Sequence, residues 1–370
     1  MDGRDNYQLI MSKIICIIES LGQGGAERQI SYLAVLLKKT GRDVELWTYY
    51  PNDFNKPILD QYQVTYRYIE AAQNKYKRIS VLRKELKKSK ADVVISYMDT
   101  CSMSLCLVKI LGGKFRLLVS ERSSTRTIDA HTRLKFLLYR YADVVIPNSY
   151  SETNTIKAHF PFLKDKISTI VNFVDLEKFS IPQKQLCNTD GSIIIIGVGR
   201  ITTAKNLIRL ADAIKKVIDS GYNIKLNWYG DVTNEQLNEQ LKERIMLHGI
   251  SDRFMLHPAT RDIVEHYHHA DVFCLASIYE GFPNVICEAM SCGLPVLCSN
   301  VCDNGIIVQD KINGVLFDPL SVDDITRAFV EYINTMHVNR KNIGLRNRER
   351  ITEMCSENSF VGNYIKLIEP

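Results

Sequence analysis

Two glutamates eight positions apart, Glu280 and Glu288, are residues whose type and spacing could do chemistry. The turn between them consists of Gly281, Phe282, Pro283 and Asn284. Because proline suits the first position of a helix, we expect a helix to begin at Pro283. The turn then lies at the carboxyl end of a parallel strand, where open α/β sheets bind ligands and where a carboxylate can accept hydrogen bonds from a sugar diol. The alternative is an exposed turn residue followed by a solvated helix residue.

A second loop contains a glycine and two cationic residues. Gly199 and Arg200 follow the apolar run 193–198, and Lys205 precedes a helical pattern. Glycine lets a ligand approach the backbone closely, and cations beside a helix start can clamp a diphosphate without a metal ion. A surface turn with two solvated cations is the alternative. The glycine and the cations together after an apolar strand favour the clamp.

A third loop is glycine-rich and joins the first apolar run to the first helical pattern. It contains Gly24 and Gly25, which leave room for a ligand at the amino end of a helix. Many first strand-to-helix turns contain such glycines, so this loop is the least specific of the three.

Alternating apolar runs and amphipathic stretches position these loops. We expect strands at 14–18, 44–49, 92–96, 117–120, 144–146, 193–198, 224–229, 254–256, 272–276 and 295–299, with helices between them. This alternation predicts parallel sheets, and the polar stretch 181–192 separates two series. We therefore expect an α/β chain of two doubly wound domains, 1–180 and 181–355, facing each other across a cleft. A C-terminal helix within 356–370 is expected to pack back on the first domain.

The composition is that of an ordinary globular protein, with 45% hydrophobic and 24% charged residues. No apolar run approaches the length of a membrane span. Ten cysteines form no CxxC pair and no compact Cys/His pattern, so we expect reduced thiols, a cytoplasmic location and no metal site. A histidine cluster, His266, His268 and His269, is interpreted as surface or interdomain residues.

Charge divides the chain into a basic and a mildly acidic half. Residues 1–180 carry 28 Lys and Arg against 19 Asp and Glu, whereas residues 181–370 carry 19 against 23. The first half is therefore expected to meet an anionic partner. Its basic stretch 75–90 has Ile79, Leu82 and Leu86 at helical spacing, which fits a core-packing helix with a solvated basic face. It fits equally a patch that docks on anionic lipids at the inner face of the cytoplasmic membrane.

The three loops together resemble those of the family four, group 1 glycosyltransferases, which are retaining enzymes with the GT-B fold. The residues that carry the resemblance are GGAER at 24–28, GR and KN within 199–206, and EGFPNVICEAM at 280–290. HADVFCLAS at 269–277 and INGVLF at 312–317 match the usual surroundings. SERSS at 120–124 and VIPNS at 145–149 resemble the members that build bacterial surface polysaccharides and lipid-linked oligosaccharides.

The resemblance implies roles for the loop residues. Arg200 and Lys205 match a donor-phosphate clamp, and Glu280 matches a residue near the transferred sugar, so these three are the expected catalytic residues. Glu288 matches the glutamate that holds the donor ribose. The expected donor-binding set is Gly24, Gly25, Gly199, Arg200, Lys205, Glu280, Gly281, Phe282, Pro283, Asn284 and Glu288. No cofactor or metal is implied, and the co-substrate is a nucleotide-diphosphate sugar, with a UDP-sugar favoured.

Two departures from the family pattern concern the acceptor side more than the donor side. Many relatives have a histidine in the first domain where this chain has Glu121-Arg122. Many also have a glutamate where Ile306 stands, ahead of Asp310. We expect a glycan or lipid-linked glycan as acceptor and assign no side chain as general base.

Other functions on such a scaffold are a sugar-nucleotide epimerase or hydrolase, and a non-catalytic sugar-nucleotide-binding protein. A nicotinamide dehydrogenase is disfavoured because the first loop reads GQGG and the second expected strand ends WTYY without an acid. Nucleic acid is not an expected partner.

Overall fold

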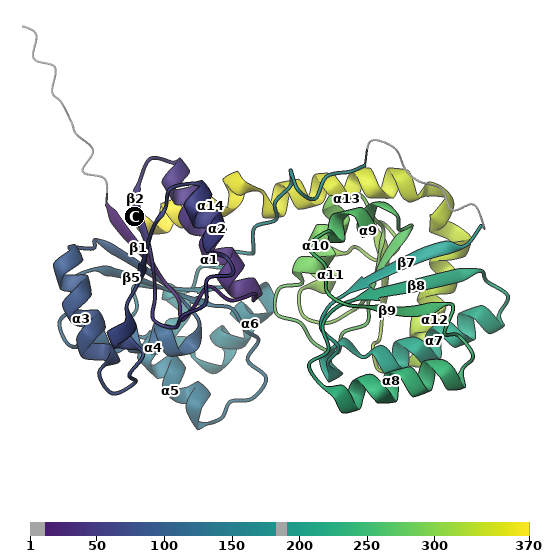
Figure 1. The fold of residues 1–370 in the computed structure, drawn as a ribbon, viewed down its shortest axis with the longest axis horizontal. Helices are drawn as coiled ribbons and strands as arrows, with labels where there is room; N and C mark the ends of the chain where they lie inside the picture. Colours follow the sequence, from purple (N-terminus) through teal and green to yellow (C-terminus); the bar gives the residue numbers. More distant parts are fainter. Residues whose placement is uncertain (1–11, 183–190, 370) are drawn as a thin grey trace, which may run out of the picture. The chain divides into compact units, whose positions relative to one another are not determined.

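The computed structural model describes residues 12–182 and 191–369 (Figure 1). The chain divides into two compact units. The first contains the residues up to Phe173 together with those from Phe360 onward, and the second is Val174–Ser359.

Residues 174–180, which the sequence assigned to the first domain, belong to the second unit. The reason is their hydrogen bonding. Val174 N–H donates to the Cys355 carbonyl (3.0 Å), and Ser291 Oγ donates to the Phe179 carbonyl (2.7 Å). Most of the expected linker, residues 183–190, lies outside the described residues.

Six parallel strands form the sheet of the first unit in the order β3-β2-β1-β4-β5-β6. The strands are β1 (Lys13–Ile17), β2 (Asp43–Thr48), β3 (Thr65–Tyr68), β4 (Val93–Tyr97), β5 (Arg116–Glu121) and β6 (Val144–Pro147). The helices are α1 (Gly25–Lys39), α2 (Lys56–Gln61), α3 (Arg78–Ser89), α4 (Asp99–Ile110), α5 (Ala130–Tyr139) and α6 (Tyr150–His159). Ile14 and Cys16 pack against α1, while Ile15 and Ile17 pack on the other face against α3, α4 and α5.

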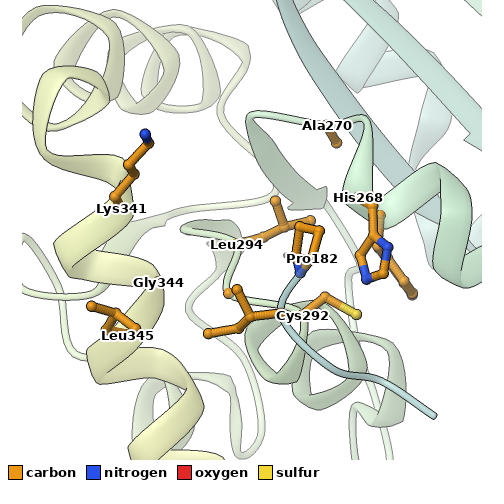
Figure 2. Close-up of a pocket in the computed structure, with 11 residues that line it drawn as sticks. Pro182, His268, Ala270, Cys292, Leu294, Lys341, Gly344 and Leu345 are labelled. Carbon is orange, nitrogen blue, oxygen red and sulfur yellow. The ribbon is translucent and has the colours of Figure 1, made fainter. Parts of the chain in front are cut away.

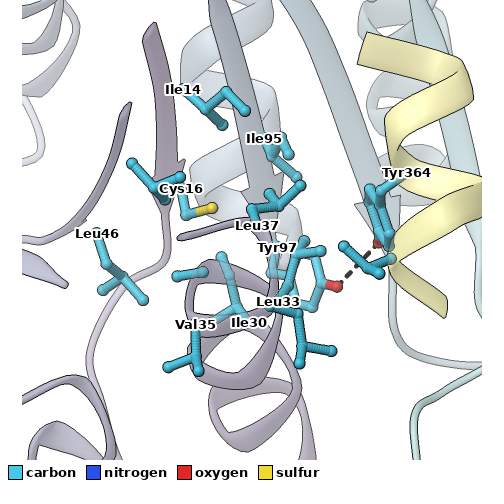
Figure 3. Packing of buried hydrophobic residues seen from close by; sticks show 14 of the residues in the cluster. Ile14, Cys16, Ile30, Leu33, Val35, Leu37, Leu46, Ile95, Tyr97 and Tyr364 are labelled. Atoms are coloured by element: carbon cyan, nitrogen blue, oxygen red, sulfur yellow. Dashed lines mark hydrogen bonds between the residues drawn. The ribbon is translucent and has the colours of Figure 1, made fainter. Parts of the chain in front are cut away.

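The last helix, α14 (Glu357–Ile368), contributes to the core of the first unit. Its buried side chains Phe360, Val361, Tyr364 and Ile368 join the cluster that contains Ile14 and Leu33 of β1 and α1. The hydroxyl groups of Tyr97 and Tyr364 are hydrogen-bonded at 2.9 Å (Figure 3). The first unit is thus completed by residues that follow the second unit in the sequence.

A second parallel six-stranded sheet, in the order β12-β11-β10-β7-β8-β9, forms the other unit. Its strands are β7 (Ile193–Val198), β8 (Ile224–Tyr229), β9 (Phe254–His257), β10 (Val272–Leu275), β11 (Val296–Ser299) and β12 (Gly314–Phe317). The helices are α7 (Leu207–Asp219), α8 (Glu235–Leu247), α9 (Ile263–His268), α10 (Asn284–Ser291), α11 (Asn304–Ile307), α12 (Val322–Glu331) and α13 (Arg340–Cys355). The predicted α/β class with two doubly wound sheets is confirmed.

Two edge strands, β3 and β12, were not among the predicted strands. β3 has the sequence TYRY with partly exposed side chains, and β12, GVLF, begins with a glycine, so both give a weaker strand pattern than the predicted strands. Among the described residues, no helix has both the length and the apolar character needed to cross a membrane.

Candidate functional site

The loop that follows β7 is held tightly by its neighbours. Gly199 has φ +153°, a backbone conformation that L-residues with a side chain rarely adopt. Its carbonyl accepts a hydrogen bond from Trp228 Nε1 (2.8 Å), and its N–H donates to the Tyr229 carbonyl (2.9 Å). Gly199, which the sequence singled out, therefore fixes the backbone at the start of the loop that contains Arg200 and Lys205.

Lys205 is the last residue of a short 3₁₀ turn, Thr203–Lys205. Its side chain packs against the backbone of Gly199. A Cβ atom on Gly199 would lie 2.8 Å from Lys205 Cε. The ammonium group of Lys205 forms an ion pair with Glu280 at 2.5 Å, with side chains 17% and 13% exposed. Asn206 then has φ +60°, so α7 begins at Leu207 and not at Asn206.

Arg200 differs from Lys205 in its surroundings. Its side chain is exposed, and among the described residues no ion pair or hydrogen bond of its guanidinium is found. The two predicted clamp cations are therefore unequal. One is neutralised by a carboxylate within the same unit, and the other is available to a ligand.

The turn that carries Glu280 is attached to the Lys205 loop. Ile278 N–H donates to the Ala204 carbonyl (2.8 Å), and Glu280 N–H donates to Cys302 Sγ (3.5 Å). Since β7 and β10 are adjacent in the sheet, the loops that follow them meet at its carboxyl edge. The structure thereby brings together two of the three predicted catalytic residues.

The prediction that α10 begins at Pro283 was wrong by one residue. Pro283 is the N-cap, with φ −82° and ψ 72°, and α10 begins at Asn284. The Pro283 carbonyl already accepts hydrogen bonds from Ile286 and Cys287 N–H, as an N-cap carbonyl does. Of the remaining turn residues, Gly281 is half-buried and Phe282 is buried.

Glu288 lies in the second turn of α10 and is only 5% exposed. The alternative of a solvated helix glutamate is therefore excluded. A carboxylate in this position needs polar or charged partners, because burial of an unpaired charge is expensive. Glu288 and Glu280 thus belong to one strand–turn–helix unit but have different environments.

Two cavities lie in the described part of the second unit, and one of them adjoins this region. One, of about 570 Å³, is large enough for a ligand and begins next to the turn at Ile278. Three carboxylates line it, Asp310, Asp318 and Asp324, and each accepts a backbone hydrogen bond.

The other cavity, of about 260 Å³, lies at the carboxyl end of α10 (Figure 2). Its labelled lining includes Pro182, His268, Cys292, Leu294 and Lys341. This lining is mostly apolar, and none of the predicted site residues belongs to it.

In the first unit, Gly24 is the N-cap of α1 and Gly25 its first residue. The carboxylate of Glu27 folds back over this loop, so that a Cβ atom on Gly24 would overlap Glu27 Oε2. An acidic group therefore occupies the space at the amino end of α1 where the sequence suggested a ligand. Glu27 must move before an anion can lie there.

A buried charge cluster in the first unit was not predicted. Lys135 Nζ lies 2.7 Å from Glu121 Oε2 and 3.3 Å from Asp99 Oδ2, with Glu121 0% exposed. Burial raises the pKa of Glu121, although Lys135 opposes this change. Burial alone would lower the pKa of Lys135, but Glu121 and Asp99 raise it above its usual value. The position of Glu121 at the end of β5 was the available sequence signal.

Arg122, which follows Glu121, is tied into the same edge of the sheet. It donates to Asn172 Oδ1 (2.6 Å) and to the Tyr364 hydroxyl (2.8 Å). Its guanidinium carbon lies 3.8 Å from the centroid of the Tyr97 ring. Arg122, one of the two residues at the position where the family pattern has a histidine, thus joins the end of β5 to α14.

The histidines of α9 have separate partners. His266 Nδ1 lies 3.0 Å from the Tyr229 hydroxyl, and His268 Nε2 lies 2.7 Å from the Ser180 carbonyl. His269 is exposed. Within the described part of the chain, no group of three His, Cys, Asp or Glu residues is arranged to hold a metal ion.

Two family profiles match consecutive parts of the chain. Glycosyltransferase Family 4 matches residues 23–178, and Glycosyl transferases group 1 matches residues 179–350. The chain belongs to the family four, group 1 glycosyltransferases. The family resemblance carried by the three loops is thereby confirmed.

Relatives of this glycosyltransferase include the amylovoran biosynthesis glycosyltransferase AmsD of Erwinia amylovora, 26% identical over 90% of this chain and 93% of its own length. An α-1,4-N-acetyl-D-galactosaminyltransferase of Campylobacter jejuni, named for a PP-undecaprenol-linked sugar chain, is 26% identical over 76% of this chain and 77% of its own. The crystal structure of Anabaena HepE in complex with UDP and glucose has a TM-score of 0.82 at 16% identity, covering 96% of this chain and 99% of that one. The expected GT-B fold is confirmed.

Proposed function

We propose that this glycosyltransferase moves a hexose or N-acetylhexosamine from a nucleotide-diphosphate sugar to a glycan or lipid-linked glycan, with retention at the anomeric carbon and without a metal ion. A UDP-sugar is the favoured donor, and surface polysaccharide synthesis is the favoured setting. The names of AmsD, with amylovoran, and of the Campylobacter enzyme, with a PP-undecaprenol-linked chain, support this setting. The complex of HepE with UDP supports the donor.

The observation that carries the proposal is the arrangement of Arg200, Lys205 and Glu280 at the carboxyl edge of the second sheet. Lys205 and Glu280 are in contact, and Arg200 is exposed on the same loop as Lys205. A phosphate beside Arg200 and Lys205 would meet two cations, and a sugar beside Glu280 would meet a hydrogen-bond acceptor. The exposed Arg200 can therefore meet the phosphate end of a nucleotide-diphosphate sugar, and the Lys205–Glu280 pair offers a cation to the phosphate and an acceptor to the sugar.

The proposed reaction breaks the bond between the anomeric carbon and the β-phosphate oxygen. The bonding electrons leave with the phosphate, so negative charge grows on the nucleoside diphosphate. Arg200 and Lys205 stabilise that charge, an electrostatic contribution that is often the largest in enzymatic catalysis. The acceptor hydroxyl bonds to the same face of the carbon, and its proton passes to the departing phosphate.

The testing experiment incubates a panel of nucleotide sugars with and without candidate acceptors and follows release of the nucleoside diphosphate. Transfer requires an acceptor, whereas a hydrolase releases the nucleoside diphosphate with water alone and an epimerase returns a changed donor. A non-catalytic binding protein gives only a thermal shift with the ligand. Nuclear magnetic resonance of the product reports the anomeric configuration, and an inverted product would contradict retention.

A further inference from the structure

A basic cavity lies in the first unit, where the carboxyl ends of α3 and α4 meet the start of β5. Its volume is about 340 Å³. Leu86, Val108 and Phe115 form an apolar floor, and all three are buried. The cationic residues that line it are Arg83, Lys87, Lys90 and Lys114. We refer to these four side chains as the basic rim.

The basic rim has no counter-charge of its own in the part of the chain that the structure describes. Among the described residues, none of its four side chains forms an ion pair, and all four are exposed. The neighbouring acids are already engaged. Glu85 pairs with Arg67 and Lys88, and Asp143 pairs with Lys109. The positive charge of the rim is therefore available to an anion from outside the chain.

Two large apolar side chains stand beside the rim. Ile110 ends α4 and Leu111 follows it directly, and they are 46% and 51% exposed. Leu111 is joined through Gly112 and Gly113 to Lys114 of the rim. Cations around a hollow with exposed aliphatic side chains at its edge match a lipid surface, where headgroups carry charge and the region below them is apolar.

We infer that the basic rim, together with Ile110 and Leu111, docks the first unit on a membrane surface containing anionic phospholipids. The headgroup phosphate enters the cavity, and the two aliphatic side chains enter the interfacial layer. The structure also refines the two alternatives for residues 75–90. Leu82 and Leu86 pack α3 on the core, while Arg83 and Lys87 face the cavity. Lys88 is paired with Glu85 and lies outside the rim.

A nucleic acid is a poorer match for this surface. Binding of single strands uses exposed aromatic rings on which bases stack. The aromatic side chain of the cavity, Phe115, is 8% exposed and belongs to the floor. The exposed apolar residues beside the rim, Ile110 and Leu111, are aliphatic and can enter the apolar layer of a membrane.

The first experiment measures co-sedimentation of the full chain with vesicles of phosphatidylcholine, alone or mixed with phosphatidylglycerol. We expect binding to the mixed vesicles at low salt and release at high salt, because salt screens these charges. Lys87→Glu with Lys114→Glu is expected to lower the partition coefficient about 25-fold or more, from the usual contribution of one surface cation. The matched control is Lys157→Glu with Lys164→Glu, which makes the same change of net charge at exposed positions outside the cavity and should keep most of the binding.

A second variant reports insertion directly. The two tryptophans of the chain, Trp47 and Trp228, are both buried, so Leu111→Trp adds an exposed indole. Its fluorescence should shift to the blue with mixed vesicles and not with phosphatidylcholine alone. Absence of binding at low salt, equal loss in the rim and control variants, or tight binding to single-stranded DNA with no vesicle-induced shift of the added indole would each overturn the inference. None of these readouts uses donor turnover, so failure here and failure of the proposed function are distinguishable.

Discussion

Lys205 and Glu280 form an ion pair at 2.5 Å although they lie 75 positions apart in the sequence. The contact joins the loop after β7 to the loop after β10. It means that the lysine of the proposed phosphate clamp also neutralises the glutamate proposed to lie near the sugar. Loss of either side chain therefore changes the charge that the other presents to the donor.

Lys205→Ala is expected to weaken binding of the free nucleoside diphosphate more than Arg200→Ala does. A lost charge-assisted hydrogen bond costs about 1.5–3 kcal/mol, and the uncompensated Glu280 carboxylate would then also repel the phosphate. Adding Glu280→Gln to Lys205→Ala removes that repulsion and should restore part of the affinity. Isothermal titration of the single and double variants measures the coupling. Strictly additive losses would show that the ion pair has no part in donor binding.

Arg200→Ala should lower affinity for the nucleoside diphosphate about tenfold to a hundredfold, from the same cost of a charge-assisted bond. Because Arg200 is exposed, the thermal midpoint of the free protein should not change. Arg346→Ala, at an exposed position of α13, is the matched control and should bind like the wild type. Wild-type affinity in Arg200→Ala would remove this residue from the clamp.

The two glutamates should separate binding from transfer. Glu288→Ala is expected to impair nucleotide binding, whereas Glu280→Ala is expected to impair sugar transfer more than nucleotide binding. Glu288 is 5% exposed, so its variant needs a thermal unfolding control, and Glu288→Gln keeps the volume of the side chain. Affinity and single-turnover rates are measured for each. Loss of nucleotide binding in Glu280→Ala alone would reverse the two roles.

Chelation is expected to leave transfer unchanged. In the proposed mechanism Arg200 and Lys205 supply the counter-charge for the departing phosphate, so no divalent cation is needed. Initial rates are compared in metal-depleted buffer with and without EDTA. Complete loss that added magnesium or manganese restores would contradict a metal-independent clamp.

The buried pair Glu121–Lys135 gives a pH-dependent prediction. Burial raises the folded-state pKa of Glu121 above its unfolded value, so its contribution to stability falls as pH rises from the unfolded pKa through the folded pKa. Lys135→Met removes the cation that opposes this effect and raises the folded pKa further. Relative to the wild type, its loss of stability should therefore be small up to the wild-type folded pKa of about 7. Above that pH it should grow by about 1.4 kcal/mol per pH unit toward about 3–5 kcal/mol.

Thermal midpoints of wild type and Lys135→Met across this pH range provide the measurement. Glu121→Gln combined with Lys135→Met has no titrating carboxyl at this position, so the growing difference should disappear. A pH-independent destabilisation by Lys135→Met alone would show that Lys135 does not change the titration of Glu121 in the folded protein.

The sequence predicted the strands that are covered on both faces, because they form unbroken apolar runs such as residues 193–196 of β7. It did not predict β3 or β12, whose short segments at sheet edges lack that pattern. The start of α10 was displaced by one residue because proline is acceptable both as N-cap and as first helical residue. These differences are local and leave the fold class unchanged.

The residues of the candidate site were predictable individually, but their contacts were not. Lys205 meets Glu280 only because β10 pairs with β7 in the sheet, and strand order is not contained in the local pattern of either segment. Glu121 and Lys135 lie 14 positions apart on a strand and a helix, so their pairing also depends on packing. The sequence predicted that Gly24 and Gly25 bind the donor, but it did not predict that the Glu27 carboxylate lies against their loop. The rotamer of Glu27 decides which ligands the loop can accept.

The contribution of α14 to the first core also orders events during synthesis. Residues 174–359 are contiguous, so the second unit can fold as soon as they leave the ribosome. Most of the first unit is translated earlier, but Phe360, Tyr364 and Ile368 of its core emerge only after residues 174–359. Until then the part of the Ile14 and Leu33 cluster that α14 covers is exposed, and Arg122 lacks its hydrogen bond to Tyr364. The nascent chain must therefore hold an exposed apolar surface through most of translation, and a break before residue 360 would leave that surface in the finished protein.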